Sequence, residues 1–384
     1  MRVLGLMSGT SADGIDAVVA EFTGRPGRPH WRILASAATP YPADLHQRLV
    51  AVGQGQPLAA AEVLDLAEAL TEAQAAAARA ADPDGRAELV GCHGQTLWHR
   101  PPEAGRRGLS LQLLLGPLLA HQLARPVVFD FRSADLALGG QGAPLVPAAD
   151  AALLGGIGGW RALLDLGGIA NLTLLPPSSG PESRAPVQGW DCGPANTLLD
   201  LAVQQFSDGQ HRFDADGAWA RNGRIDEAWI QAWLQEPYFR QAPPKSTGRE
   251  LFGRSDLHRR LEDLAAGNPG RNPDPADALA TLTAFTAAAV AADLERGTRP
   301  LELLVAGGGA RNGFLMAQLR QRCRGTAVLP LADLGIADEQ REALAFALLA
   351  WWHQQGHPGS LPSVTGAARP SVLGVRADPP GQVS

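Results

Sequence analysis

The chain has 384 residues, of which 45% are apolar and 19% charged, so it can form packed cores, and its length predicts two domains. Its 33 basic and 39 acidic side chains give a net charge of -6, which argues against a protein that binds nucleic acid or a membrane surface. We expect a cytoplasmic protein, because no apolar run is expected to span a bilayer and Ser8 interrupts the N-terminal apolar stretch. We expect neither disulfides nor cysteine zinc sites, because the three cysteines lack paired spacing.

The first part of the chain predicts a β-hairpin followed by alternating helices and strands. Two apolar runs, 3–7 and 15–22, flank a turn rich in Gly, Ser, Thr and Asp at 8–14. A stretch rich in Ala, Leu and Glu predicts a helix over 59–80. Further along we expect strands at 89–92 and 126–129, a helix at 113–123, and a polar, glycine-rich loop at 132–147.

The same pattern then starts again. The apolar runs 162–166 and 169–175 flank a glycine pair and predict a second hairpin, followed by a proline-rich surface loop at 176–186. After it we expect helices at 197–205, 226–235 and 276–294, a strand at 301–305, and helices from 313 onward and over 339–353. Two hairpins, each followed by mixed strands and helices, predict two similar α/β domains that face one another.

The turn of the first hairpin is a candidate site for a nucleotide. Its glycines allow the backbone to pass close to a ligand, and its N–H groups and hydroxyls form a concavity that binds anions. Two of its carboxylates are suited to hold Mg²⁺ through water. The alternative is an ordinary hairpin turn. The candidate residues are Gly9, Thr10, Ser11, Ala12, Asp13, Gly14, Ile15 and Asp16.

Two later glycine turns are weaker signals when each is taken alone. Neither Gly167-Gly168 nor Gly307-Gly308-Gly309 forms a dinucleotide fingerprint, and both are compatible with plain tight turns. A P-loop is excluded, because the single lysine, Lys245, does not follow a glycine-rich turn. Three such turns are what two facing domains need in order to hold a polyphosphate and to support the base and ribose.

Carboxylates are the next candidates. Asp191 precedes the sequence CGP and a predicted helix, so it is either a general base at a constrained turn or a helix N-cap. Asp135 lies in an unusually polar stretch, and Glu342 lies on a predicted helix, where a solvated charge pair is the alternative. We expect His93 and His99 to be structural or solvent-facing rather than metal ligands.

The only lysine of the chain lies in a dense polar cluster, KSTGRE, after two prolines. A solvated loop that ends at a helix cap is one interpretation. A functional role is the other, because arginine is the compositional default of this chain and yet lysine stands here.

Taken together, the motifs resemble one family, the anhydro-N-acetylmuramic acid kinases of bacterial cell-wall recycling. The resemblance extends in the family's order from residue 5 to 367. The matching stretches are GLMSGTSADGIDAV, CHGQT, DFRSADLALGGQGAPLVP, LGGIANLT, DCGPANTLLD, DADGAWA, PPKSTGRELF, AGGGARN, EALAFA and LPSVTGA.

The resemblance implies an α/β, two-lobed fold like that of actin and hexokinase, with ATP and Mg²⁺ in a cleft between the lobes. We expect one lobe over 1–136, joined by 355–384, and the other over 137–354. The implied enzyme is a homodimeric sugar kinase that hydrolyses the 1,6-anhydro bridge of anhydro-N-acetylmuramic acid and phosphorylates O6.

The resemblance also assigns roles to residues. Asp191 matches the catalytic base, and residues 9–16 match the ATP-binding segment. Segments expected to line the sugar site contain Gln95, Thr96, Arg132, Asp135 and Glu342. The chain departs from the family pattern at Leu113-Leu114-Leu115, Phe129 and Ala149-Asp150.

Two other functions stay open from the sequence. One is a kinase of the same superfold that acts on another small molecule. The other is a non-catalytic sensor of a sugar or nucleotide, which has no need of the acid at 191.

Overall fold

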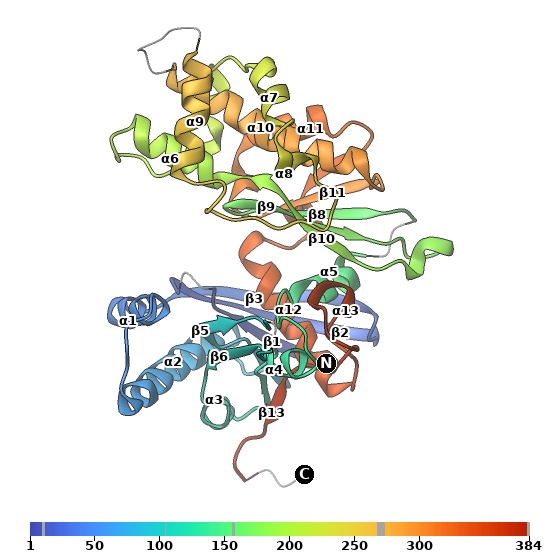
Figure 1. The fold of residues 1–384 in the computed structure, drawn as a ribbon. Helices are drawn as coiled ribbons and strands as arrows, with labels where there is room; N and C mark the ends of the chain where they lie inside the picture. The colour runs from blue at the N-terminus through green and yellow to red at the C-terminus, as the bar shows by residue number, and fades with distance from the viewer. Residues whose placement is uncertain (10–11, 104, 156–157, 267–272, 382–384) are drawn as a thin grey trace. The chain divides into compact units, whose positions relative to one another are not determined.

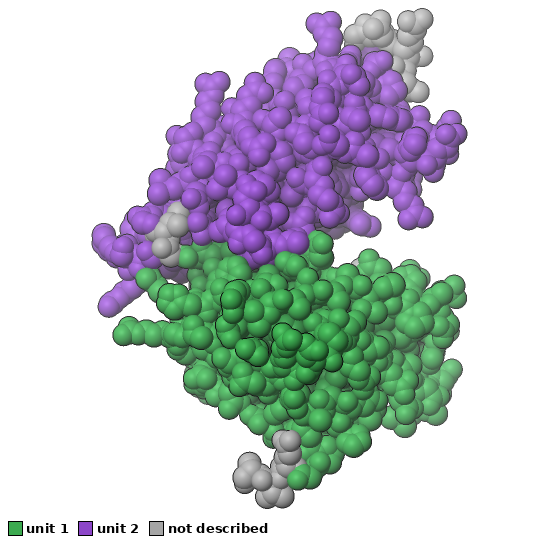
Figure 2. All heavy atoms as spheres, turned by 180° about the vertical axis from the view of Figure 1, so that it is seen from behind, with its two compact units in different colours: residues 1–156, 339–384 green, residues 157–338 purple. Residues whose placement is uncertain are grey.

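The computed structural model describes residues 1–9, 12–103, 105–155, 158–266 and 273–381. The chain forms two compact units (Figures 1 and 2). The first unit combines residues 1–156 with residues 339–384, and the second consists of residues 157–338. The first unit is therefore assembled from both ends of the chain.

The main sheet of the first unit has the strand order β13-β7-β4-β1-β2-β3. Its strands are β1 (Arg2–Met7), β2 (Gly14–Arg25), β3 (Arg28–Pro40), β4 (Leu89–Cys92), β7 (Val127–Phe129) and β13 (Val375–Ala377). β1 is antiparallel to β2, with Met7 opposite Asp16, and parallel to β4. The expected first hairpin is thus confirmed.

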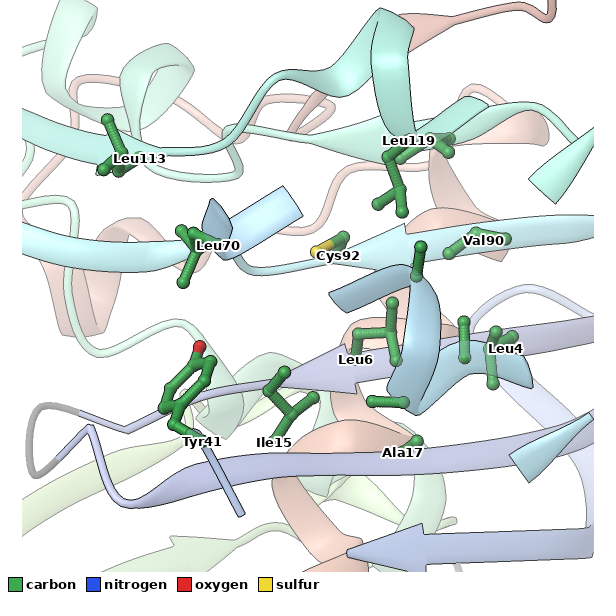
Figure 3. Close-up of a cluster of buried hydrophobic side chains, with 14 of the residues drawn as sticks. Leu4, Leu6, Ile15, Ala17, Tyr41, Leu70, Val90, Cys92, Leu113 and Leu119 are labelled. Atoms are coloured by element: carbon green, nitrogen blue, oxygen red, sulfur yellow. The ribbon is translucent and has the colours of Figure 1, made fainter. Parts of the chain in front are cut away.

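Helices and a small hairpin complete this unit. The helices are α1 (Ala43–Gly53), α2 (Ala60–Ala81), α3 (Gly116–Leu123), α4 (Ser133–Ala137), α5 (Val146–Leu154), α12 (Asp338–Gln354) and α13 (Pro362–Thr365), and the hairpin pairs β5 (Gln95–Arg100) with β6 (Leu109–Leu113). On one face of the sheet, Leu4, Leu6 and Ile15 contribute to an apolar cluster with Leu70 of α2 (Figure 3).

The other face of this sheet packs against α12. Gly5 of β1 and Gly91 of β4 allow this contact, because a side chain at either position would overlap the backbone of α12 at Ala343 or Phe346. The unit boundaries therefore differ from those expected at 136 and 354. Helix α12 belongs to the first unit, and Arg341 on α12 pairs with Asp150 at 2.7 Å, which ties residues 137–155 to the same unit.

The sheet of the second unit has the order β10-β9-β8-β11-β12. Its strands are β8 (Arg161–Leu166), β9 (Ile169–Leu175), β10 (Gln188–Pro194), β11 (Glu302–Ala306) and β12 (Ala327–Pro330). β8 is antiparallel to β9 and parallel to β11, as β1 is antiparallel to β2 and parallel to β4. The two units thus repeat one topology, which confirms the expected two-lobed α/β fold class.

Helix α10 is a buried core helix of the second unit. The helices here are α6 (Asn196–Phe206), α7 (Glu227–Trp233), α8 (Pro237–Arg240), α9 (Arg254–Ala265), α10 and α11 (Gly313–Arg322). By length and composition α10 (Pro275–Arg296) meets the criterion for a membrane span, contrary to the expectation from the sequence. Its most apolar window is 89% buried within the structure, as in the core helix of a globular unit.

Several elements differ from the sequence expectations. The expected helix at 113–123 begins only at Gly116, because Leu113 ends strand β6. The expected loop at 132–147 contains α4 and the start of α5. The strands β3, β5, β6, β10, β12 and β13 and the helices α1, α8, α9 and α13 were not expected from the apolar pattern.

We expect Gly91→Ala to destabilise the protein by about 1–3 kcal/mol or to abolish folding, since the added methyl group would overlap the carbonyl of Phe346. Gly53→Ala is the matched control, because a Cβ there meets no described atom within 4 Å. Urea unfolding of both variants checks this contact. Equal stability of the two variants would contradict it.

Candidate functional site

The turn between β1 and β2 is held by the side chain of Gln95 at the start of β5. The Gln95 amide donates to the Gly9 carbonyl at 2.9 Å, and its oxygen accepts from the Ser8 hydroxyl at 2.7 Å. Ala12 in this turn has a positive φ of 52°, and its N–H donates to the Gly9 carbonyl. Thr10 and Ser11, both expected to bind nucleotide, lie outside the described residues.

Three carboxylates, those of Asp13, Asp16 and Glu339, repel one another beside this turn. Burial, followed by repulsion from Glu339 and Asp13, raises the pKa of Asp16 to about 6. A bound divalent cation would offset this repulsion, so the donor set fits Mg²⁺ chemically. Among the described residues no group of three His, Cys, Asp or Glu side chains is arranged to hold a metal by itself. A metal here would therefore keep water or phosphate ligands.

Gln95 and Asp135 support loops from buried positions. Gln95 is only 2% exposed, and its amide nitrogen and oxygen contact Gly9 and Ser8 respectively. Asp135 is completely buried, and its carboxylate accepts from the Gly142 N–H at 2.8 Å and the Thr365 hydroxyl at 2.7 Å. Both were expected in segments that contact the sugar, and the structure places both side chains inside the unit.

In the first unit Arg132 contacts His93 and interacts electrostatically with Glu342. The Arg132 guanidinium donates to the Gly142 carbonyl at 2.7 Å and lies 2.9 Å from Nε2 of His93. Burial lowers the pKa of Arg132 below its usual value, and the charge of Glu342 offsets part of this lowering. Thr96 contacts Gln112 at 3.0 Å on the adjoining hairpin.

In the second unit, Asp191 lies at a bulge of β10, directly opposite Asn171 of β9. Asn171 donates to Oδ1 of Asp191 at 2.9 Å, and Oδ2 accepts from the Ser246 hydroxyl at 3.0 Å and the Thr247 N–H at 2.9 Å. The residue is half-buried. Three donors thus fix the orientation of a carboxylate that still reaches the surface of the unit.

The polar cluster singled out by its lysine supplies two of these three donors. Its functional interpretation in the sequence is consistent with this position beside Asp191. Asn171 and Tyr238, whose hydroxyl donates to the Asp191 carbonyl at 2.7 Å, were missed. Asn171 stands three residues after the glycine pair, in LGGIANLT, so the motif itself contained a signal for it.

The glycine pair Gly167-Gly168 receives the start of helix α6. The N–H groups of Asn196 and Thr197 donate to the carbonyls of Gly167 and Gly168, both at 3.1 Å. A Cβ at position 168 would lie 2.7 Å from the Thr197 hydroxyl oxygen. The pair therefore makes a tight junction between the hairpin and α6.

The glycine triplet borders a cavity of about 220 Å³ within the second unit. Gly307 has a φ of 81°, and a Cβ there would meet the Asp165 carboxylate at 2.5 Å. Gly308 lines the cavity together with Asn196, Leu199, Asp200, Phe213, Asp214, Asp216, Arg311 and Asn312. Burial raises the pKa of Asp200 to about 6, and Phe213 is 63% exposed. An aromatic ring beside hydrogen-bonding groups suits a planar polar ligand. The sequence reasoning singled out Gly308 alone of these residues.

Comparisons with known proteins agree on one family. The model for the family described as "Anhydro-N-acetylmuramic acid kinase" matches residues 1–378. Proteins named anhydro-N-acetylmuramic acid kinase from Parasynechococcus marenigrum strain WH8102 and Synechococcus sp. strain CC9902 are 62% and 63% identical to this chain, each over 99% of this chain and 100% of the relative.

Among solved structures, the activator of the 2-hydroxyisocaproyl-CoA dehydratase from Clostridium difficile matches with a TM-score of 0.42 and 13% identity. The match covers 92% of this chain and 96% of that one.

We expect buried His93 to make stability depend on pH. Burial, followed by the charge of Arg132, lowers the pKa of His93 to about 3, against 6.5 for the free side chain. The unfolded chain therefore binds a proton that the folded chain rejects, so this group costs about 1.4 kcal/mol of stability per pH unit as the pH falls from about 6.5 towards 3.

Urea unfolding of the wild type and of His93→Gln at pH 7.5 and 4.5 measures this effect. The stability of the wild type should fall more steeply with decreasing pH than that of the variant. Parallel pH dependences would contradict the low pKa of His93.

Proposed function

This chain belongs to the anhydro-N-acetylmuramic acid kinase family, and we propose that it opens the anhydro bridge of 1,6-anhydro-N-acetylmuramic acid with water and transfers the γ-phosphoryl group of ATP to O6, with Asp191 as the general base. The observation that carries the assignment of the base is the fixed, half-exposed carboxylate of Asp191.

The chemistry follows from the bridged sugar, which has no free 6-hydroxyl. Asp191 takes a proton from water as the water oxygen bonds to the anomeric carbon. The bond from that carbon to the bridge oxygen breaks, and the bridge oxygen, now O6, bonds to the γ-phosphorus as ADP leaves. The products are N-acetylmuramic acid 6-phosphate and ADP. Such base assistance contributes about 10²–10⁴-fold to the rate.

The hydrogen bonds of Asp191 suit this role. A carboxylate has about four acceptor sites, and Asn171, Ser246 and Thr247 use three of them. One site remains for a water molecule. Since the three donors also fix the rotamer, the water is held in one direction, which is the positioning that general base catalysis needs.

The nucleotide is assigned to the glycine turns. The cavity beside Gly308 offers an exposed Phe213 ring for the base, and its carboxylates offer acceptors for ribose hydroxyls. The turn at 9–16 and the pair Gly167-Gly168 are assigned to the phosphates. Asp13 and Asp16 of the turn would hold Mg²⁺ through water, and the ion would supply charge neutralisation at the phosphates.

The sugar is assigned to Thr96, Arg132 and Glu342 of the first unit. Arg132 and Glu342 offer a cation for the lactyl carboxylate and an acceptor for hydroxyls. In this proposal Gln95 and Asp135 do not contact the ligand; their hydrogen bonds to the backbone support the loops that do. Peptidoglycan recycling in the cytoplasm and a homodimer complete the proposal. Sedimentation at about twice the 40.3 kDa chain mass would support the dimer.

The two alternatives from the sequence are not favoured. A kinase for another small molecule is disfavoured by relatives that carry one name over their whole length. A non-catalytic sensor is disfavoured by the retained carboxylate at 191 and its donors.

We expect the product formed in ¹⁸O-labelled water to be N-acetylmuramic acid 6-phosphate with one label at the anomeric carbon, because water and not the bridge supplies that oxygen. Mass spectrometry of the reaction with ATP and Mg²⁺ tests this. A phosphorylated product without label would refute the coupled hydrolysis, and absence of any sugar product would refute the substrate.

Asp191→Asn should lower kcat by about 10²–10⁴-fold while ATP affinity stays unchanged, because the amide keeps the shape but accepts no proton. Asp226→Asn is the control, since it alters a carboxylate that caps helix α7 in the same unit. Coupled ADP-release kinetics and calorimetric ATP titration provide the two measurements. Turnover near the wild-type value in Asp191→Asn would remove this residue as the base.

Gly308→Val should weaken ATP binding at least tenfold without unfolding the protein. A Cβ at 308 meets its nearest described neighbour at 3.7 Å, so the side chain fits but reduces the space of the cavity. Gly158→Val, in open space and not lining the cavity, is the matched control. Equal ATP affinity in the two variants would argue against a nucleotide in this cavity.

A further inference from the structure

A buried ion pair lies next to Asp191 in the second unit. Nζ of Lys245 is 3.0 Å from Oδ1 of Asp293 on α10, and the two side chains are 1% and 0% exposed. The same carboxylate accepts from the indole N–H of Trp190 at 3.1 Å and from Arg296. The Lys245 ammonium also lies 4.8 Å from the ring centre of Tyr238.

Trp190 and Tyr238, which contact this ion pair, are each also connected to Asp191, one through the chain and the other through a hydrogen bond. The Asp191 N–H donates to the Lys245 carbonyl at 2.9 Å, and the Asp191 carbonyl accepts from the Tyr238 hydroxyl. Trp190 is the residue before Asp191. Lys245 itself precedes Ser246 and Thr247, whose donors bind the Asp191 carboxylate. Both the backbone and the carboxylate of Asp191 are therefore anchored by residues that the ion pair holds.

Stability alone does not account for a pair of this kind. Removing two charges from water is costly, and well-packed apolar side chains are often as stabilising as a buried ion pair. The residue type is also specific, because the chain uses arginine at 32 of its 33 basic positions and lysine only here. A compact ammonium fits between a carboxylate and an aromatic ring where a planar guanidinium needs more room.

We propose that Lys245 and Asp293 are positioning residues for the reaction: their ion pair fixes the segment 245–247 and strand β10 so that the Asp191 carboxylate keeps its catalytic orientation. This inference rests on the proposed function of Asp191 as the base. It predicts an effect on kcat with little effect on substrate binding, because neither side chain reaches the surface of the unit.

Lys245→Met removes the charge and keeps a side chain of similar length. We expect kcat to fall about ten- to hundredfold, as for a small displacement of a catalytic group, while KM for ATP and sugar stays within about twofold. Arg260→Met is the matched control. Arg260 is also a completely buried cation of this unit, paired with Asp256 at 2.8 Å and Glu236 at 3.0 Å, and none of its ion pairs or ring contacts within the described part of the chain involves Asp191.

Rates are expressed per folded molecule, with the folded fraction taken from circular dichroism. Wild-type kcat in Arg260→Met beside a reduced kcat in Lys245→Met supports the proposal, since both variants lose a buried cation. Wild-type kcat in Lys245→Met, or an equal loss of kcat in both variants, overturns it. If Lys245→Met does not fold, Asp293→Asn, which keeps the shape of the carboxylate, undergoes the same comparison.

The double variant Lys245→Met/Asp191→Asn distinguishes action through Asp191 from an independent role. If Lys245 acts through Asp191, adding Lys245→Met to Asp191→Asn lowers the residual rate less than twofold. A full further loss overturns the positioning role. Turnover near the wild-type value in Asp191→Asn alone overturns the proposed base itself, whereas a large loss there with normal kcat in Lys245→Met overturns only the positioning inference.

Discussion

The positions of the candidate functional residues in both units depend on strand direction. In the first unit, β1, β4 and β7 run parallel, so their carboxyl ends lie at one edge of the sheet, where the hairpin turn after β1 also lies. Gly9, His93 and Arg132 follow these strand ends. In the second unit β8 and β11 end likewise in Gly167 and Gly307, and β10, two antiparallel steps from β8, brings Asp191 towards the same edge. The repeated topology thus collects residues from distant parts of the sequence at one edge of each sheet.

The sequence predicted the hairpins and core strands because their apolar runs are long and bounded by glycine. It missed β3 and β13 for a physical reason. β3 is largely exposed and its apolar residues are interrupted by Arg28, His30 and Arg32, and β13 is a short edge strand paired with β7. The importance of Lys245 was detectable as a compositional exception. Its partner Asp293 was not, because 48 residues separate the two and Asp293 lies in an otherwise apolar helix.

The departures from the family pattern lie in the packing of the first unit. Leu113 is 6% exposed in the apolar cluster under α2, and Leu114 and Leu115 pack against that cluster. Phe129 lies against Gly116, where a Cβ would overlap the ring, and Asp150 pairs with Arg341. Gln95 and Asp135 extend this lesson, because motif matching found them while only the structure shows that their side chains are buried inside the unit. Contact with the sugar is therefore proposed for Thr96, Arg132 and Glu342, and support of loops for the buried Gln95 and Asp135.

The split of the first unit between the two ends of the chain has a consequence for biosynthesis. The glycine-lined face of β1 and β4 emerges from the ribosome early, but α12, which covers it, follows the whole of residues 157–338. At about 5–20 residues per second, this interval lasts about 10–40 s. The second unit, continuous in sequence, is synthesised during that time. The nascent chain therefore lacks the helix that covers the sheet face of β1 and β4 until the whole inner unit has been made, and an uncovered apolar face of this kind is the surface that chaperones shield.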